Sequence, residues 1–541
     1  MKKFVAVLAA AILAIGLAQS TQAAAASTTT KAPAGQPTYT PPAIRWGPCS
    51  NATLVQFGAQ CGTLVVPRDY DHPHGPTIGL AVSRVLHSGS NYQGVMLVNP
   101  GGPGGSGLIY SIFKYFVPNG GGDSYDWIGF DPRGVGSSSP SLSCNANFFH
   151  GDRPPYRPTT SAIHQRWVAR SKAYAQQCAK SPNAALFKHV KTTDSVKDME
   201  SLRKALGQQQ INYYGFSYGT YLGQVYATQH PDRVRRFVWD GTVDPQRVFY
   251  RSNQDQDRAF QKTFDIYFRW LAKNSSVYDV GNTYAQVRRT FLNTQAKLDR
   301  SAEGGVLGGD ELLDVFTSAG YYVYDWEDIA SAYSTYLHKG DASELIARYQ
   351  DANPTTPGAD NGYAMYLGTQ CTDAPWPQSQ AKLDRDNWRL DRNYNYFTWA
   401  NAWFNGPCAY WKFPASKPVD VKGSKVKVPI LMIGETFDAA TPFDGSLVTR
   451  RLFPTARLIE GKDGSTHAGS LSGVACTDDT IAAYLADGTV PARAGGNQSD
   501  KVCPPVPQPD PTAAAAKQRS LVATGMPAEL RRALQQVQLH R

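Results

Sequence analysis

Ser217 lies in the pentapeptide Gly215-Phe-Ser-Tyr-Gly219, between a run of apolar and aromatic residues (211–214) and a helical pattern over 221–229. A serine on a sharp strand-to-helix turn presents its hydroxyl to a substrate. Glycines two residues away on either side avoid collisions with neighbouring elements. The following helix directs its N-terminal amides toward an anion that forms beside the serine. The pattern therefore predicts a serine nucleophile for acyl transfer.

A serine hydroxyl needs a histidine base, and the base needs an acid to orient it. Asp438 follows a predicted strand at 428–434, and His467 follows the last strand that we predict, at 457–460. The order serine, acid, histidine, each on a loop after a strand, is the order that goes with this type of nucleophile turn. Asp240, at the end of the strand after the nucleophile helix, is the alternative acid.

A glycine-rich loop precedes the nucleophile by one strand-helix unit. The buried strand predicted at 94–99 runs directly into Asn99-Pro-Gly-Gly-Pro-Gly-Gly-Ser-Gly107. Its backbone amides can approach a ligand closely because so few side chains intervene. We therefore expect the Tyr218 amide and the Gly102 amide to stabilise an oxyanion.

These residues require a sheet whose strands end near one another. Strands alternate with helices, such as the amphipathic segment at 193–206, which indicates an α/β fold with a mostly parallel twisted sheet and helices on both faces. Aromatic-rich helical segments then replace this alternation. We expect a core built from residues 43–244 and 426–505, with a helical lid insertion at 245–425 over the carboxyl ends of the strands.

The strand predicted at 125–131 ends in Asp131-Pro-Arg-Gly-Val-Gly-Ser137. Asp131 and Arg133 could take part in catalysis. A turn held by an ion pair between these two side chains is the interpretation we favour.

The N-terminus has the features of a secretory signal. Lys2 and Lys3 precede an apolar run and then small residues, which predicts a signal peptide at 1–25 and a leader or pro-segment at 26–42. No later segment reaches the roughly 18 apolar residues of a membrane span, so we expect a secreted protein, extracellular or associated with the cell wall, without stable membrane insertion. Residues 506–541 are expected to form a C-terminal tail that begins in a proline-rich linker.

The eight cysteines all follow the predicted signal peptide. An even number in an exported chain favours disulfide bonds. Among the many possible pairings we prefer the four that are local in sequence: Cys49–Cys61, Cys144–Cys178, Cys371–Cys408 and Cys476–Cys503. The chain has no CxxC or HExxH pattern, and we predict neither a metal nor another cofactor.

Composition narrows the range of partners. The chain has 541 residues, 42% hydrophobic and 18% charged, with a formal net charge of +10. The basic residues are spread thinly, and no nucleic-acid-binding motif is present, so we expect no nucleic-acid partner. We expect a monomer.

Taken together, these motifs resemble the tripeptidyl aminopeptidase branch of the α/β-hydrolase peptidases, which are relatives of prolyl aminopeptidases. The resemblance extends over residues 46–503 and rests most strongly on the glycine-rich loop and the Ser217 turn. It implies an α/β-hydrolase fold and an exported exopeptidase that releases short peptides, often tripeptides, from free N-termini. Asn99 and Pro132 depart from the related prolyl enzymes, which usually have histidine and glutamine there.

The resemblance also implies a carboxylate for the substrate's α-ammonium group. The segment Thr369-Gln-Cys-Thr-Asp373 matches a Cys-x-Asp segment of the family, which makes Asp373 the candidate. The alternative is that Asp373 only caps a turn beside Cys371.

Two other functions fit the same residues. One is a secreted carboxylesterase or lipase-like hydrolase with the same three catalytic side chains. The other is a cell-surface binding protein on a hydrolase scaffold.

Overall fold

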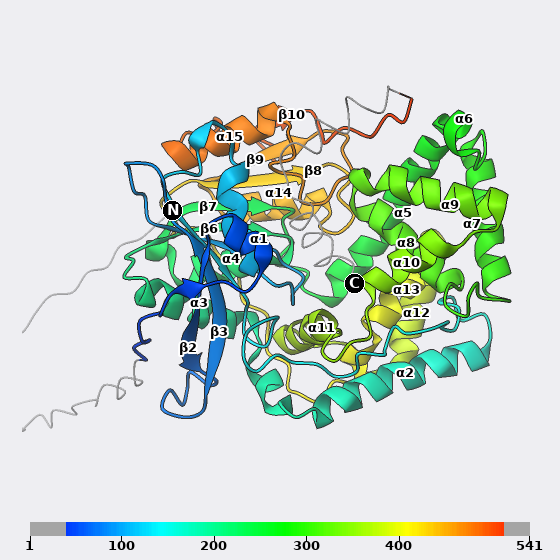
Figure 1. Cartoon of the computed structure of the whole chain (residues 1–541), viewed down its shortest axis with the longest axis horizontal. Coiled ribbons are helices and arrows are strands. Elements are labelled where there is room, and N and C mark those ends of the chain that lie inside the picture. Colours follow the sequence, from blue (N-terminus) through cyan, green and yellow to red (C-terminus); the bar gives the residue numbers. More distant parts are fainter. Residues whose placement is uncertain (1–38, 513–541) are drawn as a thin grey trace, which may run out of the picture. The chain divides into compact units, whose positions relative to one another are not determined.

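A ten-stranded sheet forms the centre of the computed structural model, which describes residues 39–512 (Figure 1). The strand order is β1-β2-β3-β5-β4-β6-β7-β8-β9-β10. β1, β2 and β3 pair antiparallel at one edge, β3 pairs antiparallel with β5, and all pairs from β5 onward are parallel. The strands are β1 Gly47–Pro48, β2 Gln60–Pro67, β3 Thr77–Val85, β4 Val95–Asn99, β5 Asp126–Phe130, β6 Ile211–Phe216, β7 Val234–Asp240, β8 Ile430–Glu435, β9 Ala456–Gly461 and β10 Lys501–Cys503.

The predicted mostly parallel α/β sheet is thus confirmed, and it extends beyond the last strand that we predicted. β10 pairs in parallel with β9 beyond the strand that we expected to be the last. It has only three residues and only Cys503 is buried, so it carries no apolar pattern from which a strand could be predicted. The predicted signal peptide, most of the leader and most of the C-terminal tail lie outside the described residues.

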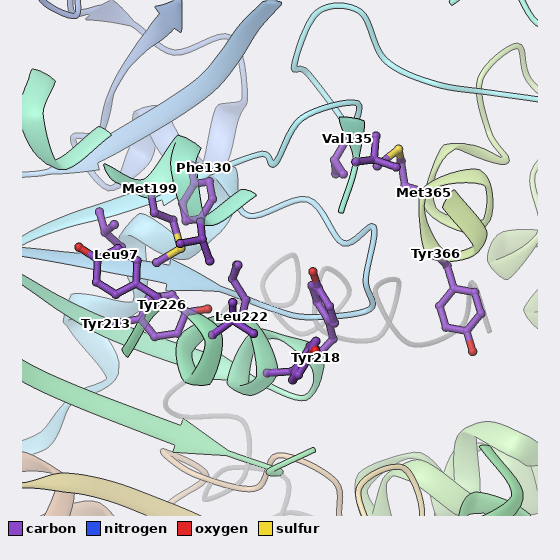
Figure 2. Close-up of a cluster of buried hydrophobic side chains, with 14 of the residues drawn as sticks. Leu97, Phe130, Val135, Met199, Tyr213, Tyr218, Leu222, Tyr226, Met365 and Tyr366 are labelled. Carbon is purple, nitrogen blue, oxygen red and sulfur yellow. The ribbon is translucent and has the colours of Figure 1, made fainter. Parts of the chain in front are cut away.

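Helices cover both faces of the sheet, so its central strands are buried on both sides. Every residue of β4, β6 and β8 is buried. Figure 2 shows part of the cluster on one face, where Leu97 and Tyr213 of the sheet lie near Met199 of α3 and Leu222 of α4. The helices of the core regions are α1 Ala52–Gln56, η1 Leu108–Phe116, η2 Pro118–Gly120, α2 Ser161–Lys180, η3 Ala184–His189, α3 Thr192–Ala205, α4 Tyr218–Gln229, η4 Pro231–Arg233, α14 Phe443–Leu452 and α15 Ala475–Ala486.

The segment between β7 and β8 is helical, as the aromatic-rich pattern indicated, and most of it packs around a second hydrophobic core. None of the helices described between residues 39 and 512 combines the length and apolar character needed to cross a bilayer. The helices of this insertion are α5 Tyr250–Lys273, α6 Ser275–Tyr278, α7 Tyr284–Leu298, α8 Gly309–Tyr321, η5 Val323–Asp325, α9 Trp326–Lys339, α10 Ser343–Ala352, α11 Asn361–Asp373, α12 Gln380–Asp391, α13 Thr398–Phe404 and η6 Gly406–Tyr410.

One helix from the first core region also packs on the insertion. Trp167 of α2 stacks on Trp403 of α13 with ring centroids 5.9 Å apart. The Trp403 indole N–H donates to the Tyr156 carbonyl at 2.8 Å. The second hydrophobic core is therefore assembled from the insertion together with stretches of the chain that precede and follow it.

The four sequence-local disulfide bonds are confirmed: Cys49–Cys61, Cys144–Cys178, Cys371–Cys408 and Cys476–Cys503. All eight cysteines are accounted for by these bonds. Disulfide bonds persist in oxidising compartments, which fits an extracellular protein.

The predicted ion pair between Asp131 and Arg133 is wrong. Arg133 instead forms a buried bidentate pair with Asp198 of α3, with N–O distances of 2.6 and 2.7 Å. Asp131 accepts hydrogen bonds from the Ser106 hydroxyl and the Gly107 amide, so it fixes the end of the glycine-rich loop. Both side chains hold loops in place, but each does so with a partner distant in sequence.

Candidate active site

The predicted nucleophile Ser217 occupies a strained turn between β6 and α4. Its φ of 53° and ψ of −125° lie in a region that non-glycine residues rarely adopt. The Ser217 amide donates to the Asp240 carbonyl at 2.9 Å, and the Ser217 carbonyl accepts from the Thr220 hydroxyl at 2.6 Å. These contacts from β7 and α4 hold the serine in the nucleophile-turn conformation that the G-x-S-x-G pattern predicts.

Glycines around this turn are required by close backbone contacts. A Cβ at Gly215 would lie 2.6 Å from the Gly219 carbonyl, and one at Gly219 would lie 2.6 Å from the Asn99 carbonyl. A Cβ at Gly101 would lie 2.9 Å from both the Ser217 Cβ and the Tyr218 nitrogen. The glycine-rich loop therefore packs directly against the serine, as its place in the sequence led us to expect.

His467 and Asp438 form a buried pair behind the turn. The Asp438 Oδ2 and Oδ1 atoms lie 2.8 and 3.0 Å from His467 Nδ1. Asp438 also accepts hydrogen bonds from the Ala440 and Thr441 amides and from the Thr441 hydroxyl. The carboxylate is fixed by four donors from two loops, so it can orient the imidazole ring.

The other ring nitrogen of His467, Nε2, makes no hydrogen bond to the Ser217 hydroxyl. His467 is fully buried, and its Nε2 has no hydrogen-bond partner among residues 39–512. The ring packs against Gly241, where a Cβ would lie 2.8 Å from His467 Cε1. Gly241 follows Asp240, whose carbonyl holds the Ser217 amide. The end of β7 thus contacts both the serine turn and the imidazole.

Asp240, the alternative acid, has a different partner. Its Oδ2 accepts a hydrogen bond from the Ser470 amide at 2.9 Å, whereas Asp438 faces His467 Nδ1. Burial raises the pKa of Asp240 to about 6, offset in part by Ser470. Burial likewise raises the pKa of Glu435 to about 8. These two acids lie near Asp438 without contacting the imidazole nitrogen.

The backbone around His467 is held by the insertion as well as by the sheet. The His467 amide donates to the Tyr321 carbonyl at the end of α8, at 2.8 Å. The Val323 amide donates to the Thr466 hydroxyl at 3.3 Å. Sequence reasoning missed these contacts because nothing in the helical pattern of α8 indicates where its C-terminus will lie.

Thr441 is a further residue that sequence reasoning missed. Its hydroxyl lies 2.8 Å from Asp438 Oδ2 and 3.3 Å from His467 Nδ1. The only sequence signal was its position three residues after the predicted acid, where a hydroxyl can return to the carboxylate.

A cavity of about 580 Å³ lies beside the Ser217 turn, but Ser217, Asp438 and His467 are not among its lining residues. Gly102 and Tyr218, the predicted oxyanion donors, both line it, as does Thr441. The insertion contributes residues of α5 and Gln370 of α11 to the wall. The charged side chains that line the cavity are Asp244, Arg247, Asp255, Arg258 and Asp444.

Asp373, the predicted acceptor of an ammonium group, lies at the end of α11 and is buried. It accepts hydrogen bonds from the Thr192 amide at 2.8 Å and the Thr192 hydroxyl at 2.5 Å. That hydroxyl also lies 2.6 Å from the Tyr218 hydroxyl. Asp373 is thus linked to the cavity wall through two side chains and is not itself among the lining residues.

Comparisons with known proteins agree with this fold. Residues 94–465 match the family described as the alpha/beta hydrolase fold. The chain belongs to the α/β-hydrolase family and is a hydrolase, which confirms the resemblance inferred from the motifs.

Three relatives illustrate the range of this similarity. The tripeptidyl aminopeptidase of Streptomyces lividans is 38% identical over 480 residues, covering 86% of this chain and 88% of that protein. Carboxylesterase B of Mycobacterium tuberculosis is 30% identical over 451 residues, covering 80% and 85%. The serine protease Hip1 of the same species is 27% identical over 476 residues, covering 83% and 89%.

Proposed function

We propose that this protein is a secreted serine exopeptidase that cleaves peptide bonds near free N-termini, as a tripeptidyl or prolyl-type aminopeptidase. The observation that carries the proposal is the buried Asp438–His467 pair beside the strained Ser217 turn. The similarity to the Streptomyces tripeptidyl aminopeptidase and to the serine protease Hip1 supports a peptidase.

In the proposed mechanism, His467 Nε2 takes the hydroxyl proton as Ser217 Oγ attacks the scissile carbonyl carbon. The Tyr218 and Gly102 amides stabilise the oxyanion of the tetrahedral intermediate. The intermediate collapses as the protonated His467 gives its proton to the leaving amine, which yields an acyl-enzyme. Water, deprotonated by His467, then attacks the ester and regenerates Ser217. Asp438 stabilises the imidazolium in both halves of the cycle.

An exopeptidase also needs a carboxylate for the substrate's α-ammonium group, because an unpaired buried charge is costly. Asp373 stays our prediction from the family resemblance. Asp244 is a second candidate because it lines the cavity and its carboxylate accepts a hydrogen bond from the neighbouring Gln246 amide, at 2.9 Å, which leaves further acceptor positions for a ligand. The D373N and D244N variants separate the two candidates. Substitution of the residue that binds the α-ammonium group should raise KM for free-amine peptides and leave KM for neutral esters unchanged.

The test of the proposal compares three substrates: a tripeptide nitroanilide with a free amine, its N-acetylated form, and a nitrophenyl ester. We expect turnover of the first, loss of turnover on acetylation, and no turnover by the S217A variant. Turnover of the acetylated peptide at the same rate would contradict exopeptidase activity. Mass spectrometry of a digested free-amine peptide library gives the number of residues released.

A secreted carboxylesterase is the second candidate function, and the 30% identity to carboxylesterase B supports it. The same nucleophile and base would serve both reactions. Ester turnover without any anilide turnover would favour this alternative.

Export is part of the proposal. The four disulfide bonds support an oxidising location. Mass spectrometry of the mature N-terminus from the culture medium tests the predicted signal peptide. An intact Met1 on protein retained in the cytosol would contradict export.

A further inference from the structure

Glu435 is a buried acid at the end of β8, three residues before Asp438, and only 5% of it is exposed. Each of its carboxylate oxygens accepts one backbone hydrogen bond. Oε2 accepts from the Thr466 amide at 2.5 Å, and Oε1 accepts from the Val506 amide at 2.6 Å. One side chain therefore joins two loops that are 40 residues apart in sequence.

The first of these loops carries His467. Thr466 directly precedes it, so the Glu435 contact fixes the peptide unit that leads into the histidine. The insertion contacts the same two residues from the other side, through the Tyr321 carbonyl and the Val323 amide. Glu435 at the end of β8 and the insertion therefore both hold the backbone of Thr466 and His467 in place.

The second loop is the C-terminal segment after the last disulfide, residues 504–509. The Val506 side chain is 7% exposed and belongs to the hydrophobic core of the insertion. The Trp270 indole N–H of α5 donates to the Pro509 carbonyl at 2.8 Å. This segment thus connects the insertion to Glu435, although its proline-rich sequence alone suggested a linker.

We infer that Glu435 is a positioning residue for His467, and that the C-terminal segment 504–509 acts on the imidazole through it. The inference rests on the proposed role of His467 as the base. Asp438 fixes the ring at Nδ1, whereas Glu435 fixes the backbone from which the ring projects. A displacement of about 1 Å at a reacting group can lower the rate about 100-fold, so this second restraint matters for kcat.

The chemistry of the two acceptors gives a specific test. A glutamine at 435 offers one acceptor oxygen and one N–H₂ group, so one of the two backbone amides would face a donor. V506P removes the Val506 N–H, and the proline Cδ takes the place of that hydrogen, so the Glu435 carboxylate loses its contact with the C-terminal segment. The V506A variant keeps the N–H and serves as the matched control for the lost side chain.

The experiment measures kcat, KM and the rate of Ser217 labelling by a phosphonate in the full-length wild type and in E435Q, V506P and V506A. We expect E435Q to lower kcat and the labelling rate about 10-fold to 100-fold with KM within about twofold of wild type. A merely structural role would not produce a fall in kcat and in the labelling rate at an unchanged KM. V506P should lower kcat more than V506A does, and this pair remains informative if E435Q does not fold.

The inference is overturned if kcat of E435Q stays within twofold of wild type. It is also overturned if V506P and V506A have equal kcat. A wild-type protein that the phosphonate does not label contradicts the proposed function instead. The two failures are therefore distinguishable.

Discussion

The sheet and the helical insertion contribute to this site in different ways. At the strand ends the reactive groups are fixed by backbone contacts that leave no space, as at Gly101 and Gly241. Around the cavity the insertion presents half-exposed charged side chains: those of Arg247, Asp255 and Arg258 are 38%, 27% and 44% exposed. If the proposed mechanism holds, the sheet therefore determines the type of reaction, and the insertion determines which substrates reach it. Substitutions in the two regions should have effects of different size and kind.

The largest effect is expected for the acid on the sheet side. D438N should lower kcat about 10⁴-fold, because the amide no longer holds the imidazole in the required tautomer. D240N should change kcat less than about tenfold, since Asp240 contacts Ser470. Steady-state kinetics on one peptide nitroanilide checks both. The reverse order of effects would make Asp240 the acid and break the assignment.

A smaller effect is expected where the glycine-rich loop meets the serine. G101A should lower kcat about 100-fold to 1,000-fold, because its Cβ would lie 2.5 Å from the Phe216 carbonyl and displace the oxyanion donors. G151A is the control, since Gly151 also has a positive φ, of 74°, but a Cβ added there would have no atom of the described residues within 4 Å. If G101A and G151A had equal kcat, contact between the added Cβ and the serine turn would not explain the kcat of G101A.

The effects become modest in the insertion. D255N removes one negative charge from a cavity that has three acidic and two basic lining side chains, so binding of a free-amine substrate should weaken. We expect KM to rise about twofold to fivefold with kcat unchanged. D328N, on the exposed surface of α9, should leave KM unchanged. A fall in kcat of D255N would mean that the insertion takes part in the chemistry.

The smallest effect concerns stability at the boundary between the two regions. Burial raises the pKa of Asp373 from 3.8 to about 7, so between these values the folded protein binds more protons than the unfolded chain. The stability associated with this group is present below pH 4 and is lost as the pH rises through 7. D373N does not titrate, so the Tm of wild type relative to D373N should fall by roughly 2–4 °C between pH 4 and 8. A constant difference in calorimetry would contradict the raised pKa.

The Ser217 turn and the Asp438–His467 pair could be predicted from sequence because they depend on local signals. The turn at Ser217 requires glycines at fixed positions, and Asp438 and His467 each follow a strand with a clear apolar pattern. Strand ends in a parallel sheet lie at one edge, so the order of these residues implied their proximity. The local cysteine pairs could be predicted for the same reason.

Contacts between distant segments could not be predicted in this way. The partner of Arg133 is Asp198, in the next helix but one, and Trp167 packs on Trp403 of the insertion. In neither case does the sequence pattern of one segment indicate which distant segment it will contact. The sequence places Glu435 three residues before Asp438, but only the fold brings the Thr466 and Val506 amides to its two oxygens.

The sequence by itself thus determined the reaction type, the order of the predicted catalytic residues and the helical character of the insertion. Each of these depends on residues close together in the chain, whose types restrict the backbone directly. Only the tertiary structure decided which acid faces His467 and which charged side chains line the cavity. The reason is physical: these outcomes depend on how elements pack, and many packings satisfy the same local pattern.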